Sequence, residues 1–453
     1  MTPTKIKKGL DIPIAGEPAQ EIIELSEPKQ VAAYQEFDGL KAKLLVKEGD
    51  IVSPGTPLFL DKKRPQLQFC APVSGTIAAI EYGARRALHR VLIDTGAVDA
   101  APPEFPSRGV DDLLGASRSD ILELLLASGL LSLFKQRPFS RIPDPEVTPR
   151  AIHVNGMNTA PFTPALRIAL QGQEPAFQAG LNALTRLTDG AVHLSVAAAD
   201  TDLVQNVKHV EKHAFSGPHP AGNSSVHIFN IDPMQPTDIL WTVKAIDVIR
   251  IGSLLLTGTY PGTRLITLAG PGVRESERRY YRATIGTPLT ELLGSRLEEG
   301  EQRIIKGDVL SGRAVSLDGH VSAIESAITV IPEGREQHFM GWLSPGINKF
   351  SVSRTHISGW NGLKKKWKLS TSLNGSYRPM VVTGLYDKYV PLNIMTDFLV
   401  RAVLAHDTDE AISLGILETD PEDFALCSFV CPSKMDVAGI IRQGLNEIEK
   451  EGI

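Results

Sequence analysis

The spacing of hydrophobic and polar residues divides the chain into segments with different expected secondary structure. In residues 1–100, short apolar runs alternate with turn residues: the pairs GD and PG interrupt residues 46–58, and the pair SG interrupts residues 71–80. Short runs bounded by glycine, proline and aspartate are typical of strands joined by tight turns. We therefore predict an all-β domain over residues 1–100.

Residues 101–255 follow a different pattern, in which strand-like and helix-like segments alternate after a proline-rich linker. Such alternation favours a parallel sheet covered by helices, so we predict a Rossmann-like α/β domain. The expected helices are residues 118–127, 164–170 and 200–213 and a segment after Pro236, and the expected strands are residues 151–154, 191–197 and 225–229.

The remaining chain is expected to form two further domains and a connection. In residues 256–340, the strand-like segments 262–273 and 302–312 enclose one helical segment, 288–297, which predicts a small β-grasp domain of the SLBB-like kind. Residues 341–390 are expected to be a connecting segment. Residues 391–453 are predicted to be helical, because segments 393–404 and 438–450 are both amphipathic.

Composition narrows the class of protein. The chain has 453 residues, with 42% hydrophobic and 22% charged residues, and a net charge of −5 that gives no basis for nucleic-acid binding. Its three cysteines do not form a disulfide framework. No run reaches the roughly 18–20 apolar residues of a membrane span. We therefore expect a soluble or peripheral protein without a secretory signal.

The N-terminal segment resembles the flattened β-barrel of lipoyl and biotinyl carrier domains. Those domains hold their cofactor on a hairpin lysine, and Lys62 and Lys63 lie in the corresponding region here. The flanking methionine or alanine of the carrier motifs is missing, and Arg64 and Pro65 follow. We therefore interpret the barrel as structural, with a carrier lysine as the alternative.

The segment around Cys427 and Cys431 is related to an iron–sulfur motif that has lost half its ligands. A ferredoxin-type run places cysteines at spacings of two, two and three residues before a proline. The first two of these positions hold Pro421 and Phe424 here. Two thiolates do not hold a four-iron cluster, so we predict no cluster.

Four motifs together identify a family resemblance. Residues 5–16 read KIKKGLDIPIAG, residues 217–222 GPHPAG, residues 307–312 GDVLSG and residues 425–432 ALCSFVCP. In this order they resemble the A subunits of bacterial sodium-translocating NADH:quinone oxidoreductases. The resemblance implies a peripheral subunit on the cytoplasmic face of the inner membrane, in contact with the other five subunits, of a complex that oxidises NADH, reduces ubiquinone and exports sodium.

The same family is similar to flavin-binding, NADH-oxidising subunits of complex I, but the cofactor motifs are changed. The relatives' glycine-rich flavin loop corresponds to SLFKQRPF at residues 132–139, which has no glycine to admit a phosphate. Their NADH motif corresponds to residues 155–161, where Asn158 and Ala160 replace both acids. We expect no cofactor in this chain, with FMN, FAD and 2Fe-2S in partner subunits; a flavin- and NADH-binding electron-entry subunit is the alternative.

The altered loop has two interpretations. A ubiquinone head group suits aromatic walls with a few hydrogen-bond donors. The candidate residues for such a site are Phe134, Lys135, Arg137, Phe139 and His219. In the other interpretation, Phe134 and Phe139 fill the former flavin cavity as core residues.

The remaining motifs indicate no catalytic or metal-binding residue in the sequence. The GPHPAG loop at 217–222 lacks the lysine of a P-loop and is expected to be a rigid turn. The basic cluster KKKWK at 364–368 is either a solvated loop or a contact for anionic lipid or an acidic partner. The eleven histidines show no spacing typical of metal ligands, and no nucleophile motif is present.

Overall fold

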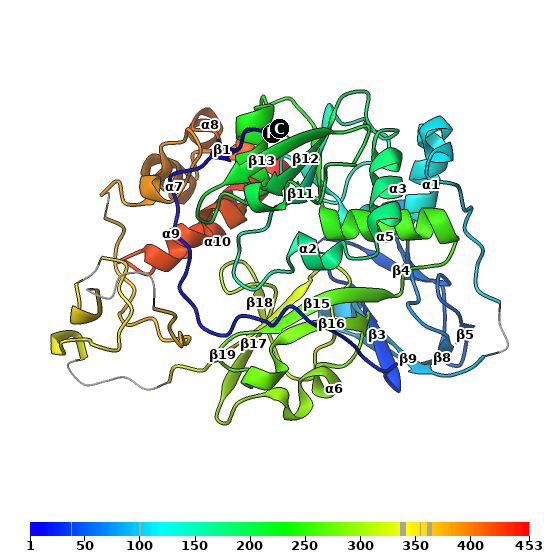
Figure 1. Ribbon diagram of the computed structural model, residues 1–453, viewed down its shortest axis with the longest axis horizontal. Helices are drawn as coiled ribbons and strands as arrows, with labels where there is room; N and C mark the ends of the chain where they lie inside the picture. Colours follow the sequence, from blue (N-terminus) through cyan, green and yellow to red (C-terminus); the bar gives the residue numbers. More distant parts are fainter. Residues whose placement is uncertain are drawn as a thin grey trace.

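The computed structural model describes residues 1–37, 39–98, 101–335, 341–353, 355–359, 365–381 and 383–452. Within these ranges the chain forms a barrel-like β domain, two larger mixed or parallel sheets and a helical C-terminal region (Figure 1). The predicted multidomain α/β class, with a barrel, a Rossmann-like domain, a β-grasp-like domain and a helical tail, is confirmed.

The barrel consists of a four-stranded sheet packed against a three-stranded one. Its core is a separate cluster that includes Val31, Leu58, Ile77 and Val91. In sheet order the strands are β3 (Gln30–Tyr34), β9 (Leu88–Thr95), β8 (Gly75–Tyr82) and β5 (Ile51–Val52), and then β4 (Ala42–Leu44), β6 (Pro57–Asp61) and β7 (Arg64–Cys70).

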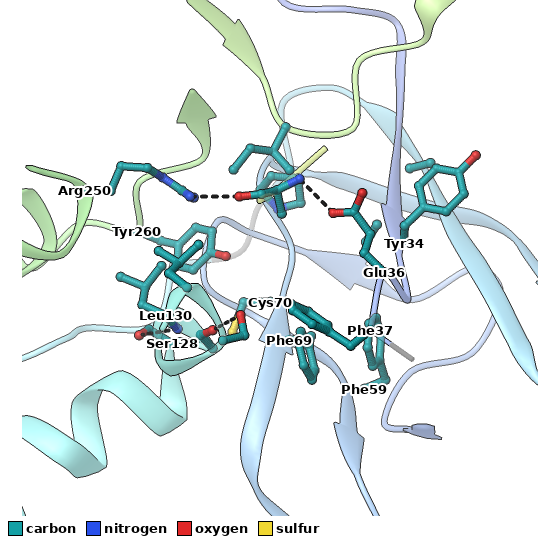
Figure 2. Close-up of a pocket in the computed structure, with 18 of the residues that line it drawn as sticks. Tyr34, Glu36, Phe37, Phe59, Phe69, Cys70, Ser128, Leu130, Arg250 and Tyr260 are labelled. Atoms are coloured by element: carbon teal, nitrogen blue, oxygen red, sulfur yellow. Dashed lines mark hydrogen bonds between the residues drawn. The ribbon is translucent and has the colours of Figure 1, made fainter. Parts of the chain in front are cut away.

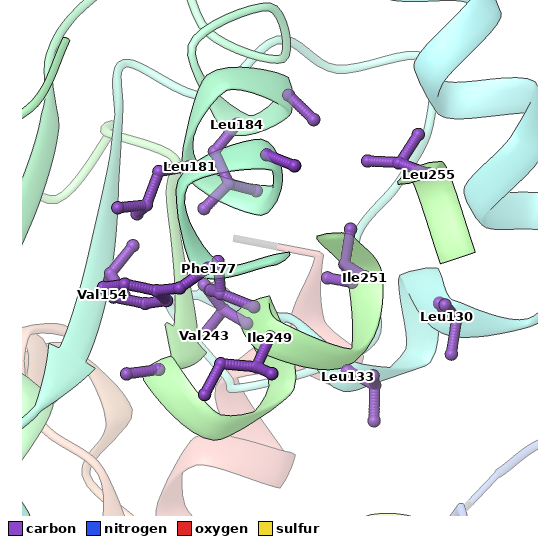
Figure 3. Close-up of a cluster of buried hydrophobic side chains, with 14 of the residues drawn as sticks. Leu130, Leu133, Val154, Phe177, Leu181, Leu184, Val243, Ile249, Ile251 and Leu255 are labelled. Atoms are coloured by element: carbon purple, nitrogen blue, oxygen red, sulfur yellow. The ribbon is translucent and has the colours of Figure 1, made fainter. Parts of the chain in front are cut away.

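A six-stranded sheet forms the second domain, with strands parallel except at the β10 edge. Its order is β1 (Thr4–Lys5), β13 (Glu211–Ser216), β12 (Val192–Ala197), β11 (Ala151–Gly156), β14 (Leu240–Lys244) and β10 (Lys135–Arg137). The helices of this domain are α1 (Arg118–Ala127), α2 (Leu166–Ala169), α3 (Glu174–Leu184), α4 (Ser224–Ile231) and α5 (Ala245–Thr257). Figure 3 shows α3 and α5 burying Phe177, Leu181 and Ile251 together.

Another six-stranded sheet contains antiparallel hairpins and the short helix α6 (Leu289–Leu293), as expected of a β-grasp-like domain. Its order is β18 (Arg313–Val315), β17 (Gln302–Lys306), β19 (Ala327–Pro332), β15 (Thr263–Ala269), β16 (Arg279–Thr284) and β2 (Ile22–Glu24). The C-terminal helices are α7 (Thr396–Leu404), α8 (Thr408–Ser413), α9 (Ala425–Val430) and α10 (Val437–Glu451).

Short 3-10 turns join these elements. They are η1 (Ala84–Arg86), η2 (Asp112–Gly115), η3 (Leu130–Leu133), η4 (Ala198–Asp200), η5 (Glu275–Glu277), η6 (Gly294–Arg296), η7 (Gly341–Leu343), η9 (Tyr386–Lys388), η10 (Ile416–Glu418) and η11 (Pro421–Phe424).

The first residues of the chain connect domains instead of belonging to the barrel sheets. β1 pairs with β13 in the α/β sheet, and β2 pairs with β16 in the β-grasp-like sheet. Between them, Leu10, Ile12 and Ile14 are buried in one cluster with the C-terminal helices. The domain limits 1–100, 101–255, 256–340, 341–390 and 391–453 stay predictions.

Two sequence-based assignments in the α/β domain are wrong. Residues 200–213, predicted to be helical, form turns followed by β13, and residues 225–229, predicted to be a strand, lie in helix α4. The segment after Pro236 first forms β14 and only then helix α5. The run 225–229 is almost entirely buried, and such a short apolar run has no period that separates strand from helix. Residues 200–210 are exposed or half-buried except for Val204, so their helix-like spacing does not correspond to a packed helical face.

Candidate functional site

Segment 132–139, which the family resemblance relates to a flavin loop, contains the end of η3 and the antiparallel edge strand β10, and several of its side chains are packed into the protein. The Phe134 ring is 1% exposed and lies edge-on to Trp241, with ring centroids 5.9 Å apart. Trp241 comes from β14, the strand paired with β10, and is itself fully buried. Phe134 is therefore a core residue of the α/β domain.

Arg137 is a buried cation that joins the α/β domain to the C-terminal helical region. Its Nη2 donates to Ser225 Oγ at 2.8 Å and to the Glu418 carbonyl at 3.1 Å, and its Nη1 lies 3.4 Å from Asp420 Oδ2. Burial acts to raise the pKa of the Asp420 carboxyl, but Lys135, Arg137 and Arg442 outweigh it and hold this pKa below its ordinary value. The Asp420 carboxyl is therefore ionised and held inside the protein beside Arg137.

Lys135 and Phe139 keep part of their surface accessible. The Lys135 side chain is 46% exposed, with Nζ 3.9 Å from Glu422 Oε2, and the carboxylates of Asp420 and Glu422 raise its pKa. Phe139 is half-buried against the C-terminal helical cluster, and its carbonyl accepts a hydrogen bond from Arg442 Nη1 at 3.0 Å. This segment therefore presents one charged donor and one aromatic ring beside the C-terminal region.

His219 lies in the GPHPAG loop and is 4% exposed. Its Nδ1 is 3.0 Å from Thr159 Oγ1, and its backbone N–H donates to Asp11 Oδ1 at 2.9 Å. A Cβ on Gly9 would lie 2.1 Å from the His219 carbonyl oxygen, which explains the glycine at that close approach. The described hydrogen bonds of His219 tie the loop to the N-terminal segment and to Thr159, not to residues 132–139.

We expect the buried His219 to make folding stability depend on pH. Burial lowers its pKa from 6.5 to about 4, so between these values the unfolded chain binds a proton that the folded chain does not. Stability therefore falls as the pH falls, by about 2 kcal/mol at pH 5 from this residue. Urea unfolding at pH 7 and pH 5 checks this: His219→Gln should lose less stability than the unmodified chain, and equal losses would contradict the assignment.

An aromatic pocket lies beside segment 132–139, where the barrel, the α/β domain and the β-grasp-like domain meet (Figure 2). Its walls come from the barrel, from residues 128–133, from α5 and the loop that follows it, and from residues 285–323 of the β-grasp-like domain, and they include Tyr34, Phe37, Phe69, Arg250 and Tyr260. Sequence reasoning missed this pocket because its residues are dispersed over most of the chain. The Cys70 thiol faces it, and burial raises the pKa of that thiol to about 12, so it stays protonated.

The cysteines of the iron–sulfur-like motif are packed into the helical core. Cys427 and Cys431 are buried, and the Tyr386 hydroxyl lies 3.0 Å from Cys431 Sγ. Burial also raises the pKa of the Cys427 thiol, which disfavours the thiolate that a metal cluster needs. Cys427 therefore acts as a small apolar side chain, and Cys431 is a buried thiol in contact with the Tyr386 hydroxyl.

The barrel hairpin that carries Lys62 and Lys63 and part of the basic cluster both contact other segments of the chain. Lys62 and Lys63 form the turn between β6 and β7, and the neighbouring Arg64 anchors this hairpin by donating to the carbonyls of Ile142 and Pro143. In the basic cluster, Lys364 lies outside the described residues. Lys366 pairs with Glu17 at 2.8 Å, and Lys365 lies over the Trp367 ring. These contacts favour structural roles for both segments.

Fold and site together define a multidomain α/β protein with a barrel, a parallel α/β domain, an SLBB-type sheet and a C-terminal helical region, in which segment 132–139 joins the α/β domain to the C-terminal helices. Family models match three successive parts: the NqrA N-terminal barrel-sandwich hybrid domain at residues 4–96, the NqrA second alpha/beta domain at 116–260 and the NQRA C-terminal domain at 265–316. The chain belongs to the NqrA family, the A subunits of Na(+)-translocating NADH-quinone reductases.

Curated relatives match over nearly the whole chain. The A subunit of the Na(+)-translocating NADH-quinone reductase of Pasteurella multocida is 40% identical over 449 residues, covering 99% of both chains. The proteins of the same name from Yersinia pestis bv. Antiqua and Photorhabdus laumondii are each 41% identical, covering 99% of this chain and 100% of theirs. A chain of an NAD+-reducing [NiFe]-hydrogenase aligns over 52% of each chain with a TM-score of 0.34 and 13% identity, which does not define a shared fold.

No helix among the described residues combines the length and the apolar character that crossing a membrane requires.

Proposed function

We propose that this chain is a cofactor-free peripheral subunit of a sodium-pumping complex that oxidises NADH and reduces ubiquinone. Its curated relatives are named as the A subunit of that reductase. In this proposal it docks on the cytoplasmic face of the inner membrane and organises the other five subunits, among them the membrane subunits. FMN, FAD and 2Fe-2S belong to those partners.

The filled loop is the observation that supports a cofactor-free role. Flavin sites of the related subunits need backbone amides that a phosphate can approach, and glycine supplies that access. Here Phe134 lies in the core against Trp241, and Arg137 is bound by Ser225, Glu418 and Asp420. A flavin could enter only if Phe134 and Arg137 moved. Phe134 is part of the core, and Arg137 is part of the interface between the α/β domain and the C-terminal region.

The absorption spectrum of the purified chain tests this role against the flavin-binding alternative. We expect no flavin bands in the native chain and no flavin released on denaturation. Flavin bands in stoichiometric amount would instead identify an electron-entry role and overturn the cofactor-free proposal.

The proposal includes a ubiquinone contact at segment 132–139. Lys135 offers an exposed ammonium group that can donate to a quinone carbonyl, and Phe139 offers a half-buried ring beside it. Phe134 and Arg137 support this surface from inside the protein, because both are buried and held by other residues. His219, which the sequence also offered as a quinone contact, is buried in a separate loop and is bound to Thr159. The aromatic pocket of Figure 2 is the competing position for the head group.

Titration of the full chain with a short-tailed ubiquinone, followed by calorimetry, tests the contact. Loss of a hydrogen bond from a charged donor costs about 1.5–3 kcal/mol, so Lys135→Ala should weaken binding at least about tenfold. Lys62→Ala is the matched control, because Lys62 is an exposed lysine on the barrel hairpin. Weakening by Phe69→Ala but not by Lys135→Ala would move the site to the pocket, and no saturable binding would leave the scaffold role alone.

A further inference from the structure

A row of histidines crosses the α/β sheet at the amino ends of its strands. His153 on β11 is the register partner of His193 on β12, and His193 is the register partner of Glu211 on β13. Register partners of parallel strands project from the same face, and so does His213, two residues after Glu211. Because cofactor sites of such sheets lie at the carboxyl ends of the strands, this row is distinct from the former flavin and NADH region.

Three of these residues bring ligand atoms together in a triangle. His193 Nδ1 lies 3.2 Å from His213 Nε2 and 3.2 Å from Glu211 Oε2, and the last two atoms are 4.0 Å apart. Ligands at about 2.0–2.1 Å from a tetrahedral zinc ion are separated by about 3.3 Å. The two distances from His193 Nδ1 agree with this spacing. The distance between His213 Nε2 and Glu211 Oε2 reaches it after a small movement of the Glu211 side chain, which is 63% exposed.

Hydrogen bonding within the protein does not account for all the imidazole nitrogens in the row. His153 is 2% exposed, and neither of its ring nitrogens has a hydrogen-bond partner among the described residues. Its ring lies 4.7 Å from that of His193 between centroids. Buried polar atoms are nearly always paired, so the unpaired nitrogens of His153 are an open position next to the ligand triangle and not part of it. In the triangle, His193 Nδ1 lies close to both His213 Nε2 and Glu211 Oε2.

We propose that His193, His213 and Glu211 bind a divalent transition-metal ion, with Zn²⁺ as the chemical class that suits two imidazoles and a carboxylate. Imidazole nitrogen is a preferred ligand of zinc and its neighbours, and three protein ligands leave one tetrahedral position to water. The His213 and Glu211 side chains are 27% and 63% exposed, so the ion reaches this edge from solvent.

A deeper set of ligands competes for the same histidine. His153, His193 and Asp232 also bring one ligand atom each within 4.8 Å of one another. Asp232, however, follows helix α4 and is already paired with Arg150 Nη1 at 2.7 Å. The Glu211 carboxylate is therefore freer than that of Asp232, and we assign the ion to His193, His213 and Glu211. The ion would connect strands β12 and β13, which makes its role structural.

Calorimetric titration of the metal-stripped, untagged full chain with Zn²⁺ tests the proposal. We expect saturable binding of one ion per chain, weakened at least about tenfold in Glu211→Gln and in His213→Gln. Both substitutions affect side chains with exposed surface, so circular dichroism should show an intact fold. The matched control is His406→Gln, because His406 and Glu447 form an exposed pair at 3.0 Å without a third ligand among the described residues.

Two further readouts distinguish a bound ion from surface adsorption. Co²⁺ in the site should give visible d–d bands of tetrahedral geometry, and at one Zn²⁺ concentration the midpoint of thermal unfolding should rise less in Glu211→Gln than in the unmodified chain and in His406→Gln. No saturable uptake, or equal affinity in all variants, would overturn the proposal. Weakening by His153→Gln without weakening by His213→Gln would place the ion in the deeper set, and that too would overturn it.

Discussion

Replacing Arg137 by alanine is expected to lower the free energy of unfolding by about 3 kcal/mol, because it removes the nearer of two arginines paired with the buried Asp420 and leaves only Arg442, whose Nη2 lies 3.6 Å from Asp420 Oδ1. The side chains of this pair are 2% and 4% exposed, so little water reaches the remaining carboxylate. The substitution also removes the donors to Ser225 and to the Glu418 carbonyl. Urea unfolding followed by tryptophan fluorescence measures this loss, and Trp241, packed against Phe134, reports directly on the segment.

An exposed ion pair serves as the control for this prediction. Arg108 and Asp120 lie 2.7 Å apart with side chains 36% and 47% exposed, and exposed pairs contribute little because water solvates either partner alone. Arg108→Ala should therefore leave the unfolding curve nearly unchanged. Asp420→Asn should destabilise the chain in the same way as Arg137→Ala. If Arg137→Ala behaved like Arg108→Ala, the pair would not hold the C-terminal region to the α/β domain.

Gly252→Ala is expected to destabilise the chain by about 3 kcal/mol, because helices α3 and α5 cross with almost no space between their backbones. A Cβ at Gly252 would lie 1.7 Å from the Ala176 carbonyl oxygen, and one at Gly180 would lie 2.3 Å from the Val248 carbonyl oxygen. Backbone atoms cannot rotate away as a side chain does, so the helices must separate and loosen the cluster of Figure 3. Alanine is the better helix former by about 1 kcal/mol, which this clash must exceed.

Gly115→Ala provides the comparison for this crossing. A Cβ at Gly115 would have no described atom within 4 Å, so alanine there should change the free energy of unfolding by no more than about 0.5 kcal/mol. Equal unfolding midpoints for Gly252→Ala and Gly115→Ala would mean that α3 and α5 do not pack through their glycines. Denaturation midpoints of the two variants, measured side by side, decide the question.

Local pattern predicted the elements that have a strong period or clear ends. The helix expected at residues 118–127 is α1 (Arg118–Ala127), capped by Ser117, whose side chain accepts from the Asp120 N–H. The amphipathic C-terminal segment expected at 438–450 is α10 (Val437–Glu451). In both cases the information lies within one turn or one face of a helix, which the sequence contains directly.

Family membership and the altered loop were also visible in the sequence. Four motifs in fixed order identified the family, and the absence of glycine from residues 132–139 predicts that the loop does not admit a phosphate. The sequence did not show how the space is used. Phe134 is buried because it packs against Trp241, which lies more than a hundred residues away in the chain.

The family, the types of domain and the periodic helices could thus be predicted from the sequence, because motifs and periodicity are properties of neighbouring residues. The tertiary structure was needed to show that β13 is a strand and α4 a helix, and that Arg137 pairs with Asp420. It also showed that His193 lies close to Glu211 and His213. The histidines show no ligand spacing along the chain, yet parallel pairing places them in one row. The physical reason is that sheet register, burial and ion pairing are set by contacts between distant segments, which local pattern does not contain.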